Sequence, residues 1–344
     1  MNQSSLNSKS YKELVMKRFL WVLIIIISSA VIIWGCKKKD QESTDAGGKK
    51  PGGQKEIVIG FSQIGAESEW RTAETKSMKS EAEKRGINLK FSDAQQKQEN
   101  QIQALRAFVA QGVDAIILAP TVEDGWEPVL REVKQAGIPV VLVDRGINVS
   151  DESLYATLIA SDFIEEGRMA AEWLAKKTNG KANIVQLEGT TGSAPANDRK
   201  KGFEEGIAKY PDMKIIASQS GDFKRANGKE VMEALLKAHP NEITAVYGHN
   251  DDMAIGAIQA IKEAGLKPGQ DILVVSIDGI KDAFKAMVDG ELNCTVECNP
   301  LLGPAAFDAV EKVLKGEQLP KKTVVKDSIF DQSVAKDVID SRQY

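Results

Sequence analysis

The sequence predicts an α/β protein of two lobes, each built on a doubly wound parallel sheet, with three chain segments forming a hinge between them. From Glu56 onward, short β-branched runs alternate with longer helical segments, which is the pattern of parallel strands covered by helices. These units fall into two groups, at about 56–144 and 182–278, and 344 residues are enough for two cores. Several predicted helices end on a glycine followed by an apolar residue, as in a Schellman cap, at Gly86, Gly112, Gly137 and Gly265.

The N-terminal 35 residues have the form of a secretory lipoprotein signal. Two basic residues precede an apolar stretch from Phe19 to Trp34, which is short for a membrane span but suits a signal peptide. Gly35-Cys36 at its end resembles the bacterial lipoprotein cleavage site. We therefore expect residues 1–35 to be removed and Cys36 to carry the lipid. An uncleaved anchor is the alternative, and both forms place the rest of the chain outside the cytoplasm, in the periplasm or on the outer face of the cell membrane.

Residues 36–55 are polar and lack apolar periodicity, so we expect a flexible tether there. Met1 and Met16 are both candidate starts of translation, because Met16 directly precedes the two basic residues of the signal.

The remaining sequence is divided between the two lobes. We expect residues 56–160 and 299–324 to form the N-terminal lobe, and residues 161–298 and 325–344 to form the C-terminal lobe. Extended runs are expected to cross between the lobes at Leu154–Ser161, Leu292–Glu297 and Thr323–Phe330.

Two helices show clear helical periodicity. The first is predicted at Gln96–Gln111, and its inward residues are Ile102, Leu105 and Val109. The second is predicted at Asp251–Ala264, and its inward residues are Ala254, Ala257, Ile258 and Ile261.

Polar side chains gather where the predicted strands end. In open α/β sheets, ligands bind outside the carboxyl ends of the parallel strands. Ser68 is a suitable N-cap and would place Trp70 and Arg71 in a first helical turn at such an end. Arginine forks, carboxylates and an aromatic ring suit a small ligand with many hydroxyl groups. The candidate contacts are Glu67, Trp70, Arg71, Asp144, Arg145, Arg199, Asn250 and Asp278.

Other conspicuous residues have structural interpretations. Trp126 is expected in the core. Asp251 and Asp252, beside His249, are interpreted as helix caps rather than metal ligands. Cys294 and Cys298 are interpreted as packing residues, because four residues along a strand span roughly 13 Å, too far for a disulfide.

The sequence lacks the signatures of catalysis and of nucleic-acid binding. No GxGxxG or Walker sequence occurs, and no nucleophile is paired with a base, so we expect no enzyme activity, no cofactor and no metal. The formal net charge is −4, whereas a nucleic-acid-binding domain usually presents a basic face.

Several stretches carry a resemblance to a known family: Gly60–Gln63, Glu67–Arg71, Gln95–Gln101, Gly125–Leu130, Asp198–Phe203, Ser218–Phe223, His249–Gly269 and Ser276–Gly279. From about Glu56 to Phe330 the chain resembles the periplasmic sugar-binding proteins of the ribose/galactose-binding class. Within this class it is most similar to the galactofuranose-binding proteins of bacterial ABC sugar importers.

The resemblance implies a type I periplasmic binding protein fold, in which two lobes close on one monosaccharide held by the same eight residues. It implies galactofuranose or a related hexose as ligand, an ABC permease and its ATPase as partners, and a monomer. Cys298 is not a residue type that contacts sugars, so Glu297 beside it is a further candidate. A sensor that presents its sugar to a chemoreceptor or kinase is the alternative. A repressor core is disfavoured by the apolar N-terminus.

Overall fold

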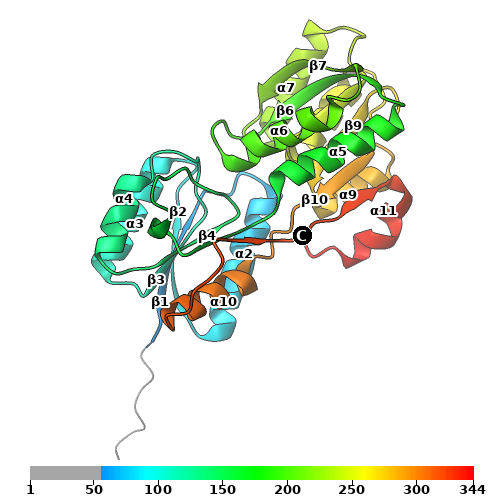
Figure 1. Ribbon diagram of the computed structural model, residues 1–344. Coiled ribbons are helices and arrows are strands. Elements are labelled where there is room, and N and C mark those ends of the chain that lie inside the picture. The colour runs from blue at the N-terminus through cyan, green and yellow to red at the C-terminus, as the bar shows by residue number, and fades with distance from the viewer. Residues whose placement is uncertain (1–55) are drawn as a thin grey trace, which may run out of the picture. The chain divides into compact units, whose positions relative to one another are not determined.

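The computed structural model describes residues 56–344, so the predicted signal peptide, tether and Cys36 lie outside the described residues. Two six-stranded sheets form the centres of two lobes (Figure 1). The first sheet has the order β11-β5-β4-β3-β1-β2 and the second the order β12-β10-β9-β8-β6-β7. The predicted α/β fold of two doubly wound lobes is confirmed. One detail differs, because the edge strand β12 runs antiparallel to β10.

The strands of the first sheet are β1 (Val58–Gln63), β2 (Asn88–Asp93), β3 (Ala115–Leu118), β4 (Val140–Val143), β5 (Thr157–Ala160) and β11 (Lys322–Val324). Those of the second are β6 (Lys181–Glu188), β7 (Asp212–Ser220), β8 (Ala245–Gly248), β9 (Leu273–Asp278), β10 (Cys294–Glu297) and β12 (Ile329–Asp331).

The helices of the first lobe are α2 (Glu69–Arg85), α3 (Gln98–Gln111), α4 (Glu127–Gln135) and α10 (Gly303–Leu314). Those of the second are α5 (Phe163–Lys177), α6 (Ala194–Ile207), α7 (Arg225–Ala238), α8 (Asp251–Glu263), α9 (Lys281–Val288) and α11 (Gln332–Val338). Short 3₁₀ turns occur at Glu152–Leu154 and Ile339–Ser341.

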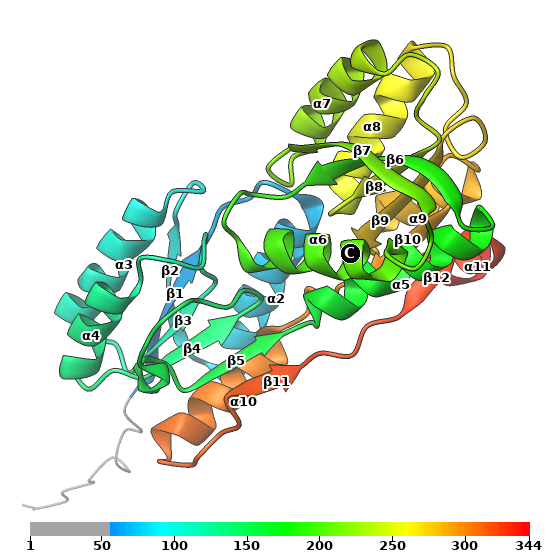
Figure 2. The same cartoon turned by 45° about the horizontal axis from the view of Figure 1, so that its top comes forward.

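Alternate residues of the first sheet pack against opposite helix layers, as expected for parallel strands covered on both faces. Ile117 and Val141 contact the layer that contains Met78 of α2 and Phe307 of α10. Ile116 and Leu142, one residue away on the same strands, pack with the layer of α3 and α4. In the second lobe, α5 and α6 pack together on one face of the sheet and α7 and α8 on the other (Figure 2).

The chain crosses between the sheets three times. It leaves the first sheet after β5 and enters α5, returns after β10 to α10, and leaves again between β11 and β12. Two of the predicted extended runs consist largely of strands β5 and β10, and the chain crosses just after each of these strands. The third predicted run, Thr323–Phe330, contains its crossing, between β11 and β12. Three adjacent connections of this kind form the hinge.

The predicted helices are found, with one difference at a helix start. Helix α3 begins at Gln98 rather than Gln96, because Gln95 and Gln96 have positive φ angles of 53° and 62° that a right-handed helix cannot contain. Trp126 is fully buried in the core, as predicted.

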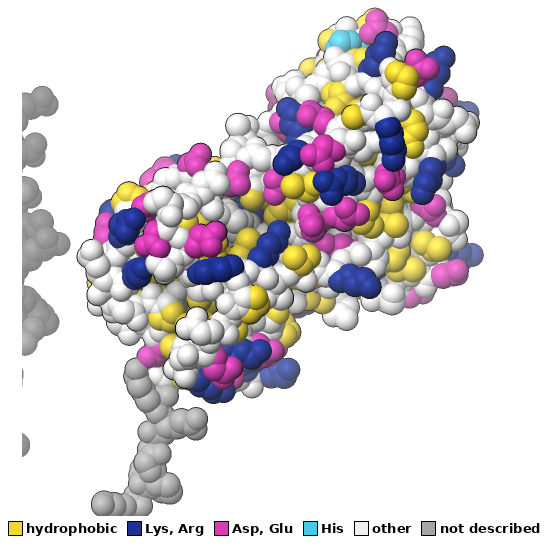
Figure 3. Space-filling view, in the orientation of Figure 1, with side chains coloured by type: hydrophobic (Ala, Val, Ile, Leu, Met, Phe, Trp, Pro, Cys, Tyr) yellow, Lys and Arg dark blue, Asp and Glu magenta, His cyan; other side chains and the backbone are white. Residues whose placement is uncertain are grey.

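Acidic and basic side chains alternate over the face of the molecule shown in Figure 3. Within residues 56–344, none of the helices is long and apolar enough to cross a bilayer.

Candidate ligand-binding site

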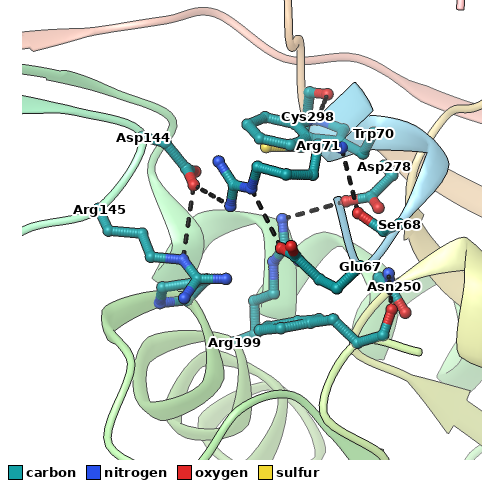
Figure 4. Close-up of a pocket in the computed structure, with 12 residues that line it drawn as sticks. Glu67, Ser68, Trp70, Arg71, Asp144, Arg145, Arg199, Asn250, Asp278 and Cys298 are labelled. Carbon is teal, nitrogen blue, oxygen red and sulfur yellow. Dashed lines mark hydrogen bonds and ion pairs between the residues drawn. The ribbon is translucent and has the colours of Figure 1, made fainter. Parts of the chain in front are cut away.

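All eight sequence-predicted contact residues line one pocket between the lobes. The first lobe contributes Glu67, Trp70, Arg71, Asp144 and Arg145, and the second contributes Arg199, Asn250 and Asp278 (Figure 4). The pocket also contains four residues that were not among the predicted contacts: Ser68, Pro195, Phe223 and Cys298.

Helix starts and strand ends place the side chains of the pocket. Ser68 caps α2, and its hydroxyl accepts a hydrogen bond from the Arg71 backbone N–H at 3.1 Å, so Trp70 and Arg71 lie in the first turn. In the second lobe, Asn250 caps α8 by accepting from the Met253 N–H at 3.0 Å. Its side-chain amide donates to the Phe223 carbonyl at 3.2 Å. Asn250 is therefore both a helix cap and part of the pocket wall.

Two carboxylates of the pocket have an unusual backbone. Asp144, directly after β4, has φ 63°, and Asp278, the last residue of β9, has φ 131°. Residues other than glycine rarely adopt these angles, and each such residue costs about 1–3 kcal/mol. Both aspartates occupy corresponding places in the two lobes, at the carboxyl ends of central strands.

Arg71 is fixed by three carboxylates. Its Nε donates to Glu67 at 3.1 Å, its Nη2 donates to Asp144 at 2.6 Å, and its Nη1 pairs with Glu74. Burial lowers the pKa of Arg71, but the three carboxylates outweigh burial and raise it well above its ordinary value. Burial raises the pKa of Glu74, behind the pocket, to about 6. The Arg71 guanidinium therefore stays charged and held in one orientation.

Arg145 is less completely paired. Its Nη1 donates to the Thr121 carbonyl at 2.9 Å, whereas its Nε makes no hydrogen bond within the described chain and lies 3.5 Å from Asp144 Oδ2. Burial, together with the positive charge of Arg71, lowers the pKa of Arg145 to about 10. The guanidinium also lies over the ring of Phe223 in the other lobe, at 5.3 Å. Arg145 therefore keeps a donor for a ligand.

Arg199 is the cation of the second lobe. Its Nε donates to Glu166 at 2.7 Å, its Nη1 donates to the His249 carbonyl at 2.6 Å, and its Nη2 lies 3.5 Å from Asp278. Burial raises the pKa of Asp278 well above its ordinary value, although Arg199 opposes this effect. The pocket thus has three arginines and three acidic residues at its wall.

Two aromatic rings add apolar surface. Trp70 is 4% exposed, and its indole Nε1 donates to the Cys298 carbonyl at 2.6 Å, which ties α2 to the second crossing. Phe223 follows β7 and is equally buried. Because no strand-end pattern precedes Phe223, only its place in the resembling stretch Ser218–Phe223 could have indicated it.

The structure corrects two predictions. Asp251 and Asp252 do not cap α8, since Asn250 does; Asp251 instead accepts hydrogen bonds from Ser276 and from Thr295, which ties α8 to β9 and β10. Glu297 does not line the pocket, because it is paired with Arg342 at 2.7 Å.

The interpretation of the two cysteines agrees with the structure. Cys294 and Cys298 are buried free thiols. Residues 56–344 contain no cluster of His, Cys, Asp and Glu that could hold a metal ion, and His249 is fully buried.

Comparison with known proteins places the chain in a family. The model of the periplasmic binding protein domain matches residues 59–318. The galactofuranose-binding protein YtfQ of Escherichia coli is 57% identical over 291 residues, covering 83% of this chain and 92% of the relative. The ribose import binding protein RbsB of Bacillus subtilis is 36% identical over 271 residues, covering 78% of this chain and 86% of the relative.

Solved structures agree with these relatives. A crystal structure of a galactofuranose-binding protein has a TM-score of 0.82 and 57% identity, and the match covers 83% of this chain and 98% of that one. The binding protein of the arabinose ABC transporter from Shewanella sp. ANA-3, solved with α- and β-L-arabinofuranose, has a TM-score of 0.82 and 56% identity, with 83% and 96% covered. These relatives are binding proteins rather than enzymes, and the chain is itself a member of the periplasmic binding protein family.

Proposed function

We propose that this chain is the substrate-binding component of an ABC importer and that it holds a neutral monosaccharide between its lobes. The observation that carries this proposal is the pocket itself, which is lined from both lobes by charged side chains of opposite sign. The proposed ligand contacts are Glu67, Trp70, Arg71, Asp144, Arg145, Arg199, Asn250 and Asp278.

The charge balance of the pocket supports an uncharged ligand. Three arginines face three acidic residues, so an ionised ligand would bring a charge with no partner into a buried site. A sugar hydroxyl can donate to a carboxylate and accept from a guanidinium at the same time. Glu67 Oε2 and Arg145 Nε are buried and make no hydrogen bond within residues 56–344, so they provide one acceptor and one donor. Five or six charge-assisted hydrogen bonds of about 1.5–3 kcal/mol each, less ordering costs, are consistent with micromolar affinity.

We propose a furanose as the ring form, and galactofuranose or a related sugar as the ligand. Two relatives above 50% identity support this choice, since one is named for galactofuranose and the other was solved with arabinofuranose. The second of these relatives is named as part of an ABC transporter, and the ribose relative is named for import, which favours transport over a sensor function.

Contacts across the cleft support closure around the ligand. The Glu69 backbone N–H of the first lobe donates to Asp252 of the second at 2.8 Å, and the Glu123 N–H donates to the Gly192 carbonyl at 2.9 Å. A sugar that touches both lobes would favour this closed form by its differential affinity for the closed and open states. The permease and its ATPase would then recognise the closed, loaded protein.

We further propose a monomeric lipoprotein, with residues 1–35 as signal peptide, Cys36 as the lipid attachment site and residues 36–55 as tether. The lobes would comprise residues 56–160 with 299–324, and residues 161–298 with 325–344. Two acyl chains at Cys36 would give a stable anchor on the outer face of a membrane. Replacement of Cys36 by serine should move the protein from the membrane fraction to the soluble fraction, and an unchanged distribution would exclude the anchor.

Calorimetric titration of the full-length protein tests the ligand. Galactose and arabinose should bind through their furanose forms, and methyl galactofuranoside should bind more tightly than methyl galactopyranoside, which has the same methyl group but a locked six-membered ring. Tight binding of the pyranoside would refute the furanose assignment. No heat with any of these sugars, with ribose or with fructose would refute sugar binding.

A further inference from the structure

Glu166 lies one layer behind the pocket and does not line it. It belongs to the first turn of α5, directly after the first crossing, and is 1% exposed. Its Oε2 accepts from Arg199 Nε at 2.7 Å, while Oε1 has no hydrogen-bond partner in the described chain. Glu166 is therefore a closer ion-pair partner of Arg199 than Asp278, whose Oδ1 lies 3.5 Å from Arg199 Nη2.

Two glycines bring the helices of this pair into backbone contact. A Cβ at Gly167 of α5 would overlap the Arg199 carbonyl oxygen, and a Cβ at Gly202 of α6 would overlap the Ile164 carbonyl oxygen. Glycine allows such close approach because it lacks a side chain. The backbones on either side of the Glu166–Arg199 pair are therefore fixed, and the ion pair has little freedom to rearrange.

We propose that Glu166 is a positioning residue, whose carboxylate holds Arg199 in the orientation that contacts the sugar. The inference rests on the proposed sugar-binding function of the pocket. Arg71 of the first lobe has Glu74 in the corresponding place, but it also keeps Glu67 and Asp144 as partners. Arg199 has a smaller reserve, because without the Glu166 charge its orientation depends on the His249 carbonyl at 2.6 Å and on Asp278 at 3.5 Å.

The surroundings of Glu166 make this role sensitive to pH. Burial raises the pKa of Glu166 to about 7, Arg199 opposes the rise, and the charge of Asp327 in the third crossing adds to it. Burial likewise raises the pKa of Asp327 to about 6. The other titratable groups that interact with Glu166 are Cys298, Tyr247 and Asp278. Because the carboxylate is the form that holds Arg199, sugar affinity should be highest above pH 7 and fall as Glu166 is protonated.

Two substitutions separate the roles of neighbouring acids. Glu166→Gln keeps the shape and removes the charge, whereas Glu165→Gln removes an exposed carboxylate in the same helical turn that pairs with Arg168. Galactose affinity is measured by calorimetry for both full-length variants and the wild type, at about pH 6 and about pH 8.

We expect Glu166→Gln to weaken binding about tenfold at the higher pH, the difference between a charged and a neutral hydrogen bond. Its affinity should depend less on pH than that of the wild type, since Glu166 no longer titrates and Glu74, Asp278 and Asp327 remain as carboxyl groups of raised pKa near the pocket. The wild type and Glu165→Gln should weaken several-fold on acidification. Glu166→Asp, which keeps the charge, should restore part of the affinity and the pH dependence. Near pH 7, sugar binding by the wild type should release a fraction of a proton, seen as a binding heat that depends on the buffer.

The outcomes distinguish the two proposals. Absence of galactose binding by the wild type would remove the proposed function. Normal wild-type binding that is tighter at low pH, or a Glu166→Gln variant with unchanged affinity and pH profile, would overturn the role of Glu166 alone. If Glu166→Gln does not fold, the wild type alone provides the test, through the dependence of its sugar-binding heat on the buffer. Proton uptake on sugar binding, or no proton exchange at all, would contradict the proposal.

Discussion

Replacing Arg145 by methionine should separate sugar affinity from stability. The change keeps an unbranched side chain of similar length and removes the guanidinium. Arg145 is 2% exposed, and its Nε has no hydrogen bond within the described chain, so a ligand hydroxyl is its expected partner. Asp144 keeps its 2.6 Å bond from Arg71, so the carboxylate side of the pocket stays in place.

The two effects can be estimated separately. A hydrogen bond from a charged donor contributes about 1.5–3 kcal/mol, so affinity should fall roughly 10- to 150-fold. Burial depresses the pKa of Arg145 to about 10, which means that the folded protein disfavours the charged form by roughly 3 kcal/mol near neutral pH. The variant is relieved of that cost. It loses the bond to the Thr121 carbonyl, which is worth about 1–3 kcal/mol in a buried position, so the free energy of unfolding should change little.

Calorimetric titration with galactose gives the affinity, and urea unfolding without sugar gives the stability. Arg131→Met, on the half-exposed surface of the same lobe, is the control and should alter neither quantity. An affinity loss below about threefold would refute the ligand role of Arg145. A loss of affinity accompanied by destabilisation above about 2 kcal/mol would show that Arg145 acts through the fold.

Three further substitutions test the site and its frame. Trp70→Ala should weaken sugar binding at least tenfold and cost about 3–5 kcal/mol of stability. Trp70→Phe, which keeps an aromatic ring but loses the bond to Cys298 and some buried volume, should cost less in denaturant unfolding. Asp252→Asn removes the charge that accepts a hydrogen bond from the start of α2 across the cleft, and it should speed sugar release about fivefold in stopped-flow measurements. Asp282→Asn, whose ion pairs with Arg225 and Lys285 lie within its own lobe, should not. Gly202→Ala should destabilise by more than about 2 kcal/mol, unlike Gly146→Ala, whose Cβ would meet only the Leu158 side chain at 3.5 Å; equal unfolding midpoints would contradict the close helix packing.

The sequence was sufficient to predict the residues that strand ends and helix starts place. Asp144 and Asp278 follow apolar runs directly, and Ser68 fixes the turn that contains Trp70 and Arg71. Because these positions depend on the local chain alone, their side chains could be assigned to one edge of each sheet.

The supporting residues could not be predicted in this way. Glu74 and Glu166 lie within helices, where an acidic residue usually faces solvent, and their burial results from contacts far away in sequence. Asp251 was interpreted as a cap because its actual partners, Ser276 and Thr295, are 25 and 44 residues away. Glu297 was considered for the pocket because nothing local indicates its pairing with Arg342.

The backbone of Asp278 has a consequence for engineering this protein. Glycine at this position would relieve the unfavourable φ angle and remove a carboxyl group whose charged form is disfavoured by burial, so a selection for heat resistance alone should favour replacing it. Such a variant would gain stability and lose a carboxylate of the pocket. At Asp144 the same change would take a buried ion-pair partner from Arg71, so no such gain is expected there. Stability and ligand recognition therefore compete at Asp278, and a thermostable version of this protein should be sought by substitutions elsewhere, with both aspartates held constant.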